Sequence, residues 1–439
     1  MPNVSEGWHS VTRRQLARWQ IERCALSQFW KASMKNNNKL ALAVVLSCSA
    51  FTAHAMPLQP LADSPAKLAV PGLPGKVWYV PSTVQTIKWG YLPNASDRPL
   101  LSVPSGATVV FDTLSHEGLL EDQGRDAEKY FMSKAVPARM VLRDAIEITR
   151  STMPHDFAKD GPHIITGPVA VDGAEPGDVL KVEVIAVTPR VPYGVISNRH
   201  GKGALPGELP EGPSPEPDAS AEHPERFHNM SVFTPIRKDR RGRWIGIMKN
   251  ARGDEVTFPT APFMGVMGVA AATDELVHSV PPGVFGGNMD VKDLGAGSVV
   301  YLPVFVRGAN FYTGDPHMVQ ANGEVALTAL EHSMRATFRL TLLKQGDARI
   351  PSSSGSLTRP FGETRDYWIA IGLNPDLDEA MKDAVREAMR FLHERLGMDR
   401  AIAFAYMSAA TDFNVSQVVD RTKGIHALIR KRDFAKVRR

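Results

Sequence analysis

The chain has 439 residues, of which 43% are hydrophobic and 22% charged, an ordinary globular composition with enough apolar material for two or three cores. Its formal net charge is +4, but seven Lys/Arg and only two acidic residues lie in residues 1–55, which leaves 44 basic and 45 acidic residues after them. A nearly neutral chain of this kind excludes recognition of a polyanion through bulk charge, so we expect no nucleic-acid partner.

The first predicted element is a secretory signal. Lys35 and Lys39 precede a short apolar run at 40–50, and small residues at 53–55 suit a signal peptidase. The run is too short to anchor the chain, so we expect cleavage after Ala55, no stable membrane insertion after signal removal, and a periplasmic or secreted protein in a bacterium. Residues 1–33 are unusually long for a signal's leading part, which makes Met34 an alternative translation start.

Both cysteines, Cys24 and Cys48, precede the predicted cleavage site. The mature chain is therefore expected to contain neither thiols nor disulfides. Two alternatives for export remain open: Arg13-Arg14 as a twin-arginine signal, and Cys48 as the attachment point of a lipid anchor.

Short apolar strands separated by Gly and Pro follow the signal region. The segments 107–113 and 179–187 alternate as half-buried strands do, and 298–306 is apolar on both faces. This pattern predicts a mainly β protein with a β-sandwich or distorted barrel core at 101–350, preceded by an N-terminal extension at 56–100. The Pro-rich stretch 201–242 is predicted to be a long surface loop that covers a cleft.

The C-terminal portion, 351–439, changes to an α+β pattern. Apolar residues recur at helical spacing from Asp376 to Leu396, with Asp376 and Glu379 resembling a capping box and Gly397 as a stop. A second apolar helix is predicted at 400–410, and strands at 415–419 and 425–429.

Two glycine-flanked polar clusters bracket the apolar strand at 298–306. The first ends in Asn288-Met289-Asp290, and the second runs from Gly314-Asp315-Pro316-His317 to Glu324. Asp, Glu and His provide the oxygen and nitrogen donors that suit Zn²⁺ or another divalent ion, and Asp-x-His in a strand directs both side chains to one face. The alternative is that Gly-Asp-Pro forms a turn, His317 caps it and Glu324 is solvated.

Four motifs in order resemble the acetamidase/formamidase family over about residues 100–430. They are Thr113-Leu-Ser-His-Glu-Gly118, Gly173-Ala-Glu-Pro-Gly-Asp-Val-Leu180, Gly286-Gly-Asn-Met-Asp290, and Gly314-Asp-x-His-x-x-Gln-x-x-Gly-Glu324. The resemblance implies a jelly-roll-like β fold and metal-assisted hydrolysis of short amides to an acid and ammonia. One motif departs from the family, because Gln-Gly-Asp-Gly-Glu is replaced by Gln320-Ala321-Asn322-Gly323-Glu324.

Without mature cysteine a thiol nucleophile is excluded, and the serine run at 352–356 lacks the flanking glycines of a serine amidase. We therefore expect an enzyme, a metal-assisted amidohydrolase, that cleaves the C–N bond of a small linear amide or lactam and requires a divalent metal, with zinc favoured. The alternative, which Asn322 suggests, is a non-catalytic periplasmic binding or scaffold protein. We also expect a homo-oligomer.

The candidate site residues fall into three roles. The predicted metal ligands are Asp290, Asp315 and His317; the predicted catalytic groups are Glu324, as general base, and His116; the predicted substrate-binding residues are Asn288 and Gln320. His163 is interpreted as a turn residue, and whether 414–420 reaches the site is left open.

Overall fold

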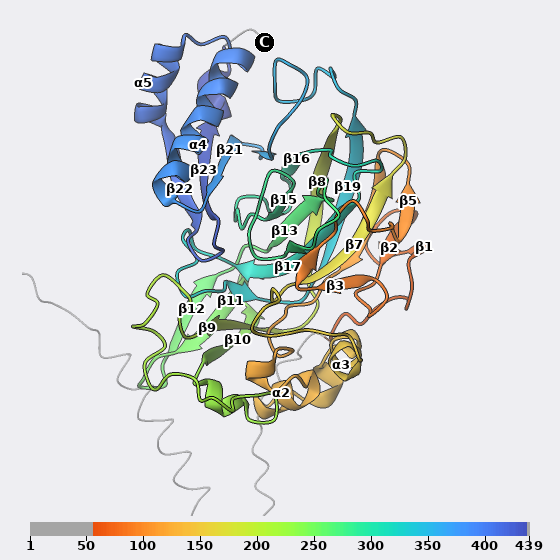
Figure 1. Cartoon of the computed structure of the whole chain (residues 1–439), viewed down its shortest axis with the longest axis vertical. Helices are drawn as coiled ribbons and strands as arrows, with labels where there is room; N and C mark the ends of the chain where they lie inside the picture. The colour runs from red at the N-terminus through yellow and green to blue at the C-terminus, as the bar shows by residue number, and fades with distance from the viewer. Residues whose placement is uncertain (1–55, 437–439) are drawn as a thin grey trace, which may run out of the picture. The chain divides into compact units, whose positions relative to one another are not determined.

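The computed structural model describes residues 56–436, so the predicted signal segment, Arg13-Arg14 and Cys48 lie outside the described residues. The described residues form one compact unit. Within this unit the predicted N-terminal extension and the C-terminal portion both contribute strands to the same sheets as the central part of the chain (Figure 1).

The first sheet has ten strands and runs from the N-terminal to the C-terminal portion of the chain. Its pairs are antiparallel except for β2 with β6. In spatial order the strands are β1 (Ala66–Ala69), β2 (Lys76–Val80), β6 (Ala107–Asp112), β19 (Met334–Leu343), β8 (Val179–Pro189), β16 (Val299–Pro303), β20 (Phe361–Glu363), β21 (Tyr367–Asn374), β23 (Lys423–Arg430) and β22 (Thr411–Gln417).

The second sheet has eleven strands, and a short pair, β4 (Tyr91–Leu92) with β14 (Val277–His278), lies apart from both sheets. The main path of the second sheet is β12 (Glu255–Pro259), β11 (Trp244–Lys249), β10 (Met230–Lys238), β9 (Tyr193–Asn198), β18 (Leu330–Glu331), β17 (Phe311–Val319), β13 (Phe263–Val269) and β15 (Gly286–Asn288). A side branch joins β17 to β7 (Ile164–Val171), which also pairs with β3 (Ile87–Trp89) and β5 (Leu101–Val103).

The main core lies between the two sheets. Phe111 and Phe338 from the first sheet meet Phe311 from the second, with ring centroids 5.3 to 5.9 Å apart in edge-to-face contacts. One apolar cluster contains residues of both sheets, so they pack face to face as a sandwich. The predicted mainly β fold is confirmed, and the described sheets are open, without the closure of a barrel.

Within residues 56–436, four α-helices flank the sheets: α2 (Ala127–Ser133), α3 (Arg143–Arg150), α4 (Leu377–Arg390) and α5 (Arg400–Ala410). The predicted helix at 400–410 is confirmed as α5. Asp376 caps α4 as predicted, accepting hydrogen bonds from the backbone of Asp378 and Glu379. The predicted continuation to Leu396 is a π-helical turn at Phe391–Arg395.

Helix α4 packs on β21 and β23 through alanines spaced four residues apart, which Figure 1 shows as the blue layer at the C-terminal end. Gly372 of β21 allows this close approach, because a Cβ there would lie 2.9 Å from the Cα of Ala384. No helix among residues 56–436 combines the length and apolarity needed to cross a bilayer.

The predicted Pro-rich loop is shorter in the structure than 201–242. Strand β10, which pairs with β9, occupies Met230–Lys238, and a 3-10 turn occupies Pro224–Phe227. The stretch before β10 is held by its own ion pairs, including His228 with Glu216 at 3.0 Å. It is therefore a structured connection between two neighbouring strands.

Candidate functional site

Strand β17, in the interior of the second sheet, carries two of the predicted ligands. Asp315 and His317 project to the same side, and His317 Nε2 lies 3.1 Å from Asp315 Oδ2. Both side chains are buried. The alternative interpretation of Gly-Asp-Pro as a turn is wrong, since these residues lie within β17, where Gly314, Pro316 and His317 pair with β13 and Gly314 also pairs with β7.

The neighbouring strand β18 places Glu331 directly opposite His317. Cross-strand neighbours on one face of a sheet lie within side-chain reach, and Glu331 Oε1 is 3.1 Å from His317 Nε2. Gln320 fixes the other side of the ring: its Nε2 donates to the carbonyls of Asp290 and Ser416, so its Oε1 faces His317 Nδ1 at 3.0 Å as an acceptor. His317 Nδ1 therefore carries a proton, and Nε2 faces the carboxylates.

Gly265 of β13 provides the space in which these side chains meet. A Cβ at this position would lie 2.6 Å from Asp315 Oδ2 and 2.9 Å from His317 Cε1, and closer still to Asp290. Asp290 follows β15, and its Oδ1 lies 3.8 Å from His317 Nδ1. Only glycine leaves room here for two aspartates and a histidine.

Three acidic residues that the sequence predicts for the site have left-handed backbone conformations, which are uncommon for residues other than glycine. Their φ angles are 50° at Asp290, 48° at Asp315 and 46° at Glu324. Such conformations cost about 1–3 kcal/mol each and persist where the surrounding structure enforces them, typically at functional sites. These three strained residues all belong to the glycine-flanked motifs at 286–290 and 314–324.

Two histidines approach Asp315 from other parts of the fold. His116 Nδ1 and His163 Nε2 each lie 3.7 Å from Asp315 Oδ1. His163 is buried just before β7, and its Nδ1 is 2.9 Å from the Ser279 hydroxyl. Burial lowers the pKa of His163 to about 4, so its ring is neutral at pH 7. The interpretation of His163 as a turn residue is therefore wrong, because its side chain lies in the cluster.

Behind His116 stands a buried ion pair. Glu117 Oε1 lies 3.3 Å from His116 Nε2 and accepts a hydrogen bond of 2.9 Å from Arg199, which also pairs with Asp122 at 2.7 Å. Ser197 also donates to Glu117. Burial acts to raise the pKa of Glu117, but the Arg199 charge outweighs it and holds that pKa well below its usual range. His116 is thus held between a permanent carboxylate and Asp315.

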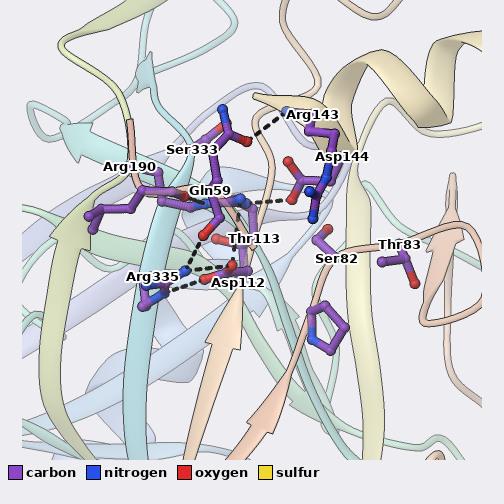
Figure 2. A network of polar contacts seen from close by, with 12 residues as sticks. Gln59, Ser82, Thr83, Asp112, Thr113, Arg143, Asp144, Arg190, Ser333 and Arg335 are labelled. Atoms are coloured by element: carbon purple, nitrogen blue, oxygen red, sulfur yellow. Dashed lines mark hydrogen bonds and ion pairs between the residues drawn. The ribbon is translucent and has the colours of Figure 1, made fainter. Parts of the chain in front are cut away.

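A second buried network fixes the chain segments that lead into the site (Figure 2). Asp112, at the end of β6, accepts hydrogen bonds from Arg335 of β19 at 2.6 and 2.9 Å. Arg190 lies 3.5 Å from Asp112 and 2.8 Å from Asp144 of α3. Asp112 precedes His116 by four residues and Arg335 follows Glu331 by four, so the network holds the bases of both segments together.

Glu324 and Asp420 complete the cluster beside Asp290. Asp420 reaches it from the turn between β22 and β23, which settles the open question about residues 414–420. Burial, followed by the charge of Asp290, raises the pKa of both Glu324 and Asp420 well above the usual range. Burial likewise raises the pKa of Asp290 to about 6 and that of Glu331 to about 8.

Four overlapping groups could hold a metal ion, with the donor atoms of each group within 4.8 Å of one another. They are His116, His163 and Asp315; Asp290, Asp315 and His317; His317, Glu324 and Glu331; and Asp290, Glu324 and Asp420. Within residues 56–436, Asp315 Oδ1 and Glu331 Oε2 are buried without a hydrogen-bond partner. Crowded carboxylates with unpaired oxygens are stabilised by a cation, and the mixed oxygen and nitrogen donors suit zinc and related divalent ions.

The cluster forms the floor of a pocket of about 390 Å³. His116, Asn288, Asp290, Asp315 and Glu324 line it, and the buried Asn288 Oδ1 has no partner among the described residues. The walls above the floor are apolar and include Phe157, Phe227 and Pro215, of which the last two belong to the Pro-rich connection. The predicted contact of this connection with a cleft is thus present.

Of the seven predicted site residues, His317 and Gln320 stand behind the pocket surface, with Gln320 fully engaged by His317 and two carbonyls. Sequence reasoning missed Glu331 and Arg199 and underrated His163. Glu331 could have been found only through its pairing with His317, and Arg199 only through its ion pair with Glu117.

Residues 270–429 match the model of the Acetamidase/Formamidase family. Over this part of the chain the match confirms the predicted family resemblance. It includes the two motifs that carry Asp290, Asp315, His317 and Glu324, and it also covers Asp420.

Curated relatives extend this similarity. Over 261 residues the chain is 28% identical to a formamidase from Methylophilus methylotrophus, covering 50% of this chain and 61% of that protein. It is 26% identical over 239 residues to an acetamidase from Mycolicibacterium smegmatis, covering 42% of this chain and 54% of that protein. The matched segment thus spans between half and two thirds of each relative.

A solved structure agrees over a longer stretch. The crystal structure of an acetamidase from Bacillus halodurans superposes with a TM-score of 0.61, covering 82% of this chain and 99% of that one, at 23% identity. At this identity the agreement concerns the fold, and it confirms the mainly β architecture.

Proposed function

We propose that the protein is a metal-assisted amidohydrolase that cleaves the C–N bond of a small linear amide or lactam. The observation that carries the proposal is the convergence of buried Asp, Glu and His donors on a pocket floor, within the segment that matches the family. Water contributes an oxygen to the carbonyl carbon, the C–N bond breaks and the nitrogen receives a proton. The products are a carboxylate and ammonia, or an amine when the nitrogen is substituted.

The donor set fits a divalent cation, for which we favour zinc. Asp290, Asp315 and His317 would hold it, with His116 and His163 available on the other side of Asp315. The chemistry that such a cation supplies when bound is polarisation of the carbonyl and acidification of a water molecule. The proton on His317 Nδ1, fixed by Gln320, leaves Nε2 free as a donor atom.

Glu324 is suited to the proton transfers. It lines the pocket beside Asp290, and burial raises its pKa, so its carboxylate accepts a proton from water readily and can return that proton to nitrogen. Asn288, also on the floor, has a free amide oxygen that can accept a hydrogen bond from the amide N–H of a substrate. His116 lies at the same floor, with Nε2 3.3 Å from Glu117 and Nδ1 3.7 Å from Asp315.

The second candidate is a non-catalytic binding or scaffold protein, which Asn322 suggests because it departs from the family motif. That side chain is exposed in the turn before Glu324 and does not line the pocket. The departure from the family motif therefore leaves the donor cluster intact, and the structure offers no separate observation in favour of this candidate.

Two variants distinguish a metal ligand, His317, from a general base, Glu324. His317→Ala is expected to lose bound metal and ammonia release from formamide, acetamide and a lactam, because the donor nitrogen is gone. Glu324→Gln is expected to keep its metal and lose about 10²–10⁴-fold in kcat, as general-base removal does. Metal content is measured by elemental analysis after dialysis, and His223→Ala, on an exposed histidine of the Pro-rich connection, is the matched control.

Full metal and full activity in His317→Ala would show that the cluster is misassigned. Metal binding without hydrolysis of any amide in the wild-type protein would favour the non-catalytic candidate instead.

We also propose that the mature protein is exported, begins at Met56 and assembles as a homo-oligomer. The intact mass of protein from the periplasmic fraction checks the N-terminus, and light scattering checks the assembly. A retained, lipid-modified Cys48 would contradict the proposed cleavage, and a monomeric mass in solution would contradict the assembly.

A further inference from the structure

The pocket changes character from floor to mouth. Its floor is acidic, its walls are mainly apolar, and two cationic side chains, Lys202 and Arg421, line its exposed mouth. A volume of about 390 Å³ is far larger than formamide needs, since one water occupies about 30 Å³ of the liquid. The space between floor and mouth therefore suits a longer molecule.

Lys202 belongs to a tight turn after β9 that is tied to the segment following Glu324. Its backbone N–H donates to the Arg199 carbonyl at 3.0 Å, and the Ala204 N–H donates to the Val325 carbonyl at 2.9 Å. Gly203 has a φ of 79°, and a Cβ there would lie 3.0 Å from the Ala326 carbonyl oxygen. The turn is thus packed closely against residues 325–326.

Arg421 belongs to the turn between β22 and β23, which is tied to Gly323, the residue before Glu324. The Gln417 side chain donates to the Thr422 carbonyl at 2.7 Å and accepts from the Asp420 backbone at 3.1 Å. The Val418 N–H donates to the Gly323 carbonyl at 3.2 Å. Arg421 has a φ of 62°, a left-handed conformation that this turn enforces.

Neither cation is neutralised by the protein. In the part of the chain that the structure describes, no hydrogen bond or ion pair is formed by the Lys202 ammonium or the Arg421 guanidinium. Both charges reach the pocket wall, because after burial they are the causes that lower the pKa of His278 there. The acidic residue at this wall, Asp160, is already engaged by the Tyr91 hydroxyl and the Asp156 backbone.

We propose that the substrate is an amide with a carboxylate at the far end of a short apolar chain, and that Arg421 and Lys202 bind this carboxylate at the pocket mouth. Arginine binds carboxylates through paired hydrogen bonds, and the second cation adds attraction. The chain of the substrate lies along Phe157 and Phe227, whose ring centroids are 5.1 Å apart. This inference rests on the proposed function and specifies its substrate class: the monoamide of a dicarboxylic acid.

The first experiment compares matched substrates on the metal-loaded enzyme. The monoamides of succinic, glutaric and adipic acid are measured beside butanamide, pentanamide and hexanamide, which have the same chain without the carboxylate. We expect higher kcat/KM for the carboxylated member of at least one pair. In Arg421→Gln that member is expected to lose about 10–100-fold in kcat/KM, as loss of a charged hydrogen bond implies, mainly through KM. The neutral amide is expected to keep its kcat/KM.

Lys423→Gln is the control, because this lysine is on the same hairpin but donates to the Pro375 carbonyl outside the pocket. It should leave both substrates unchanged. Lys202→Gln should weaken only the carboxylated substrate, and the preference should fall with added salt because both charges are exposed.

A second measurement does not depend on turnover. Adipate is titrated into wild-type protein and Arg421→Gln in a calorimeter, and weaker binding is expected in the variant. Equal kcat/KM for both members of every pair, or equal adipate binding by the two proteins, overturns this inference while leaving amide hydrolysis in place. Adipate binding that depends on Arg421, without hydrolysis of any amide, supports the carboxylate site and instead contradicts the proposed function.

Discussion

The buried network around Asp112 gives the sharpest stability prediction. Asp112 accepts two hydrogen bonds from Arg335 and one of 2.6 Å from the Tyr79 hydroxyl, and it lies 3.5 Å from Arg190, which is 1% exposed. Asp112→Asn keeps the shape but removes the charge, and its amide N–H₂ would face a guanidinium that can only donate. Arg335 would then lose its carboxylate partner, and Arg190 would keep only Asp144.

Removing one partner of a buried ion pair costs about 3–5 kcal/mol because the remaining charge is left without compensation. At about 2 °C per kcal/mol for a protein of this size class, we expect Tm to fall by roughly 6–10 °C. The assay is thermal unfolding followed by circular dichroism, with urea unfolding as a second measure of stability.

The matched control is Asp63→Asn, the same substitution in an exposed ion pair. Asp63 lies 3.1 Å from Arg143, and their side chains are 88% and 53% exposed. Exposed pairs contribute about 0–1 kcal/mol, so this variant should melt close to the wild type. If Asp112→Asn melts together with Asp63→Asn, the network does not stabilise the fold and the reasoning fails.

Three further predictions test other features. Gly265→Ala is expected to lower metal affinity by about 10–100-fold, because its Cβ would crowd Asp315 and His317; full occupancy at the wild-type affinity in a metal titration would contradict this. Burial lowers the pKa of His332 to about 4, against about 6.5 in the unfolded chain, so the unfolded state binds more protons between these values. The stability that depends on neutral His332 is therefore fully present above pH 6.5 and decreases by roughly 3 kcal/mol as pH falls to about 4. The Tm of His332→Gln should vary less with pH over this range, and an unchanged slope would count against it. Replacing residues 205–222 by a short Gly/Ser linker should raise KM, since Pro215 lines the pocket, with little change in Tm. A large fall in Tm would show that this segment contributes to the core.

The features predicted correctly from the sequence are those set by local patterns. Alternation predicted β6 and β8, helical spacing with a capping Asp376 predicted α4, and the 400–410 segment is α5. The Asp-x-His pattern on a strand predicted that Asp315 and His317 face the same way, because side chains in a strand repeat every second residue.

The features that were missed depend on pairing between distant segments. Glu331 reaches His317 because β18 pairs with β17 in one register, and Asp420 reaches Asp290 because a C-terminal hairpin folds back on the cluster. A register shift of one residue would turn Glu331 to the other face of the sheet. Local sequence carries no information about such a register. It likewise predicts a substrate contact for Gln320, whereas in the structure the Gln320 side chain orients His317.

The position of Asp420 also bears on when the site can form during synthesis. Asp420 emerges from the ribosome 304 residues (420 − 116) after His116, and Arg421 follows it. Until the hairpin of β22 and β23 has been made and has docked, the cluster lacks one of its carboxylates and the pocket lacks one side of its mouth. Chains in which this hairpin has not yet docked are therefore expected to bind cations less tightly than chains in which it has.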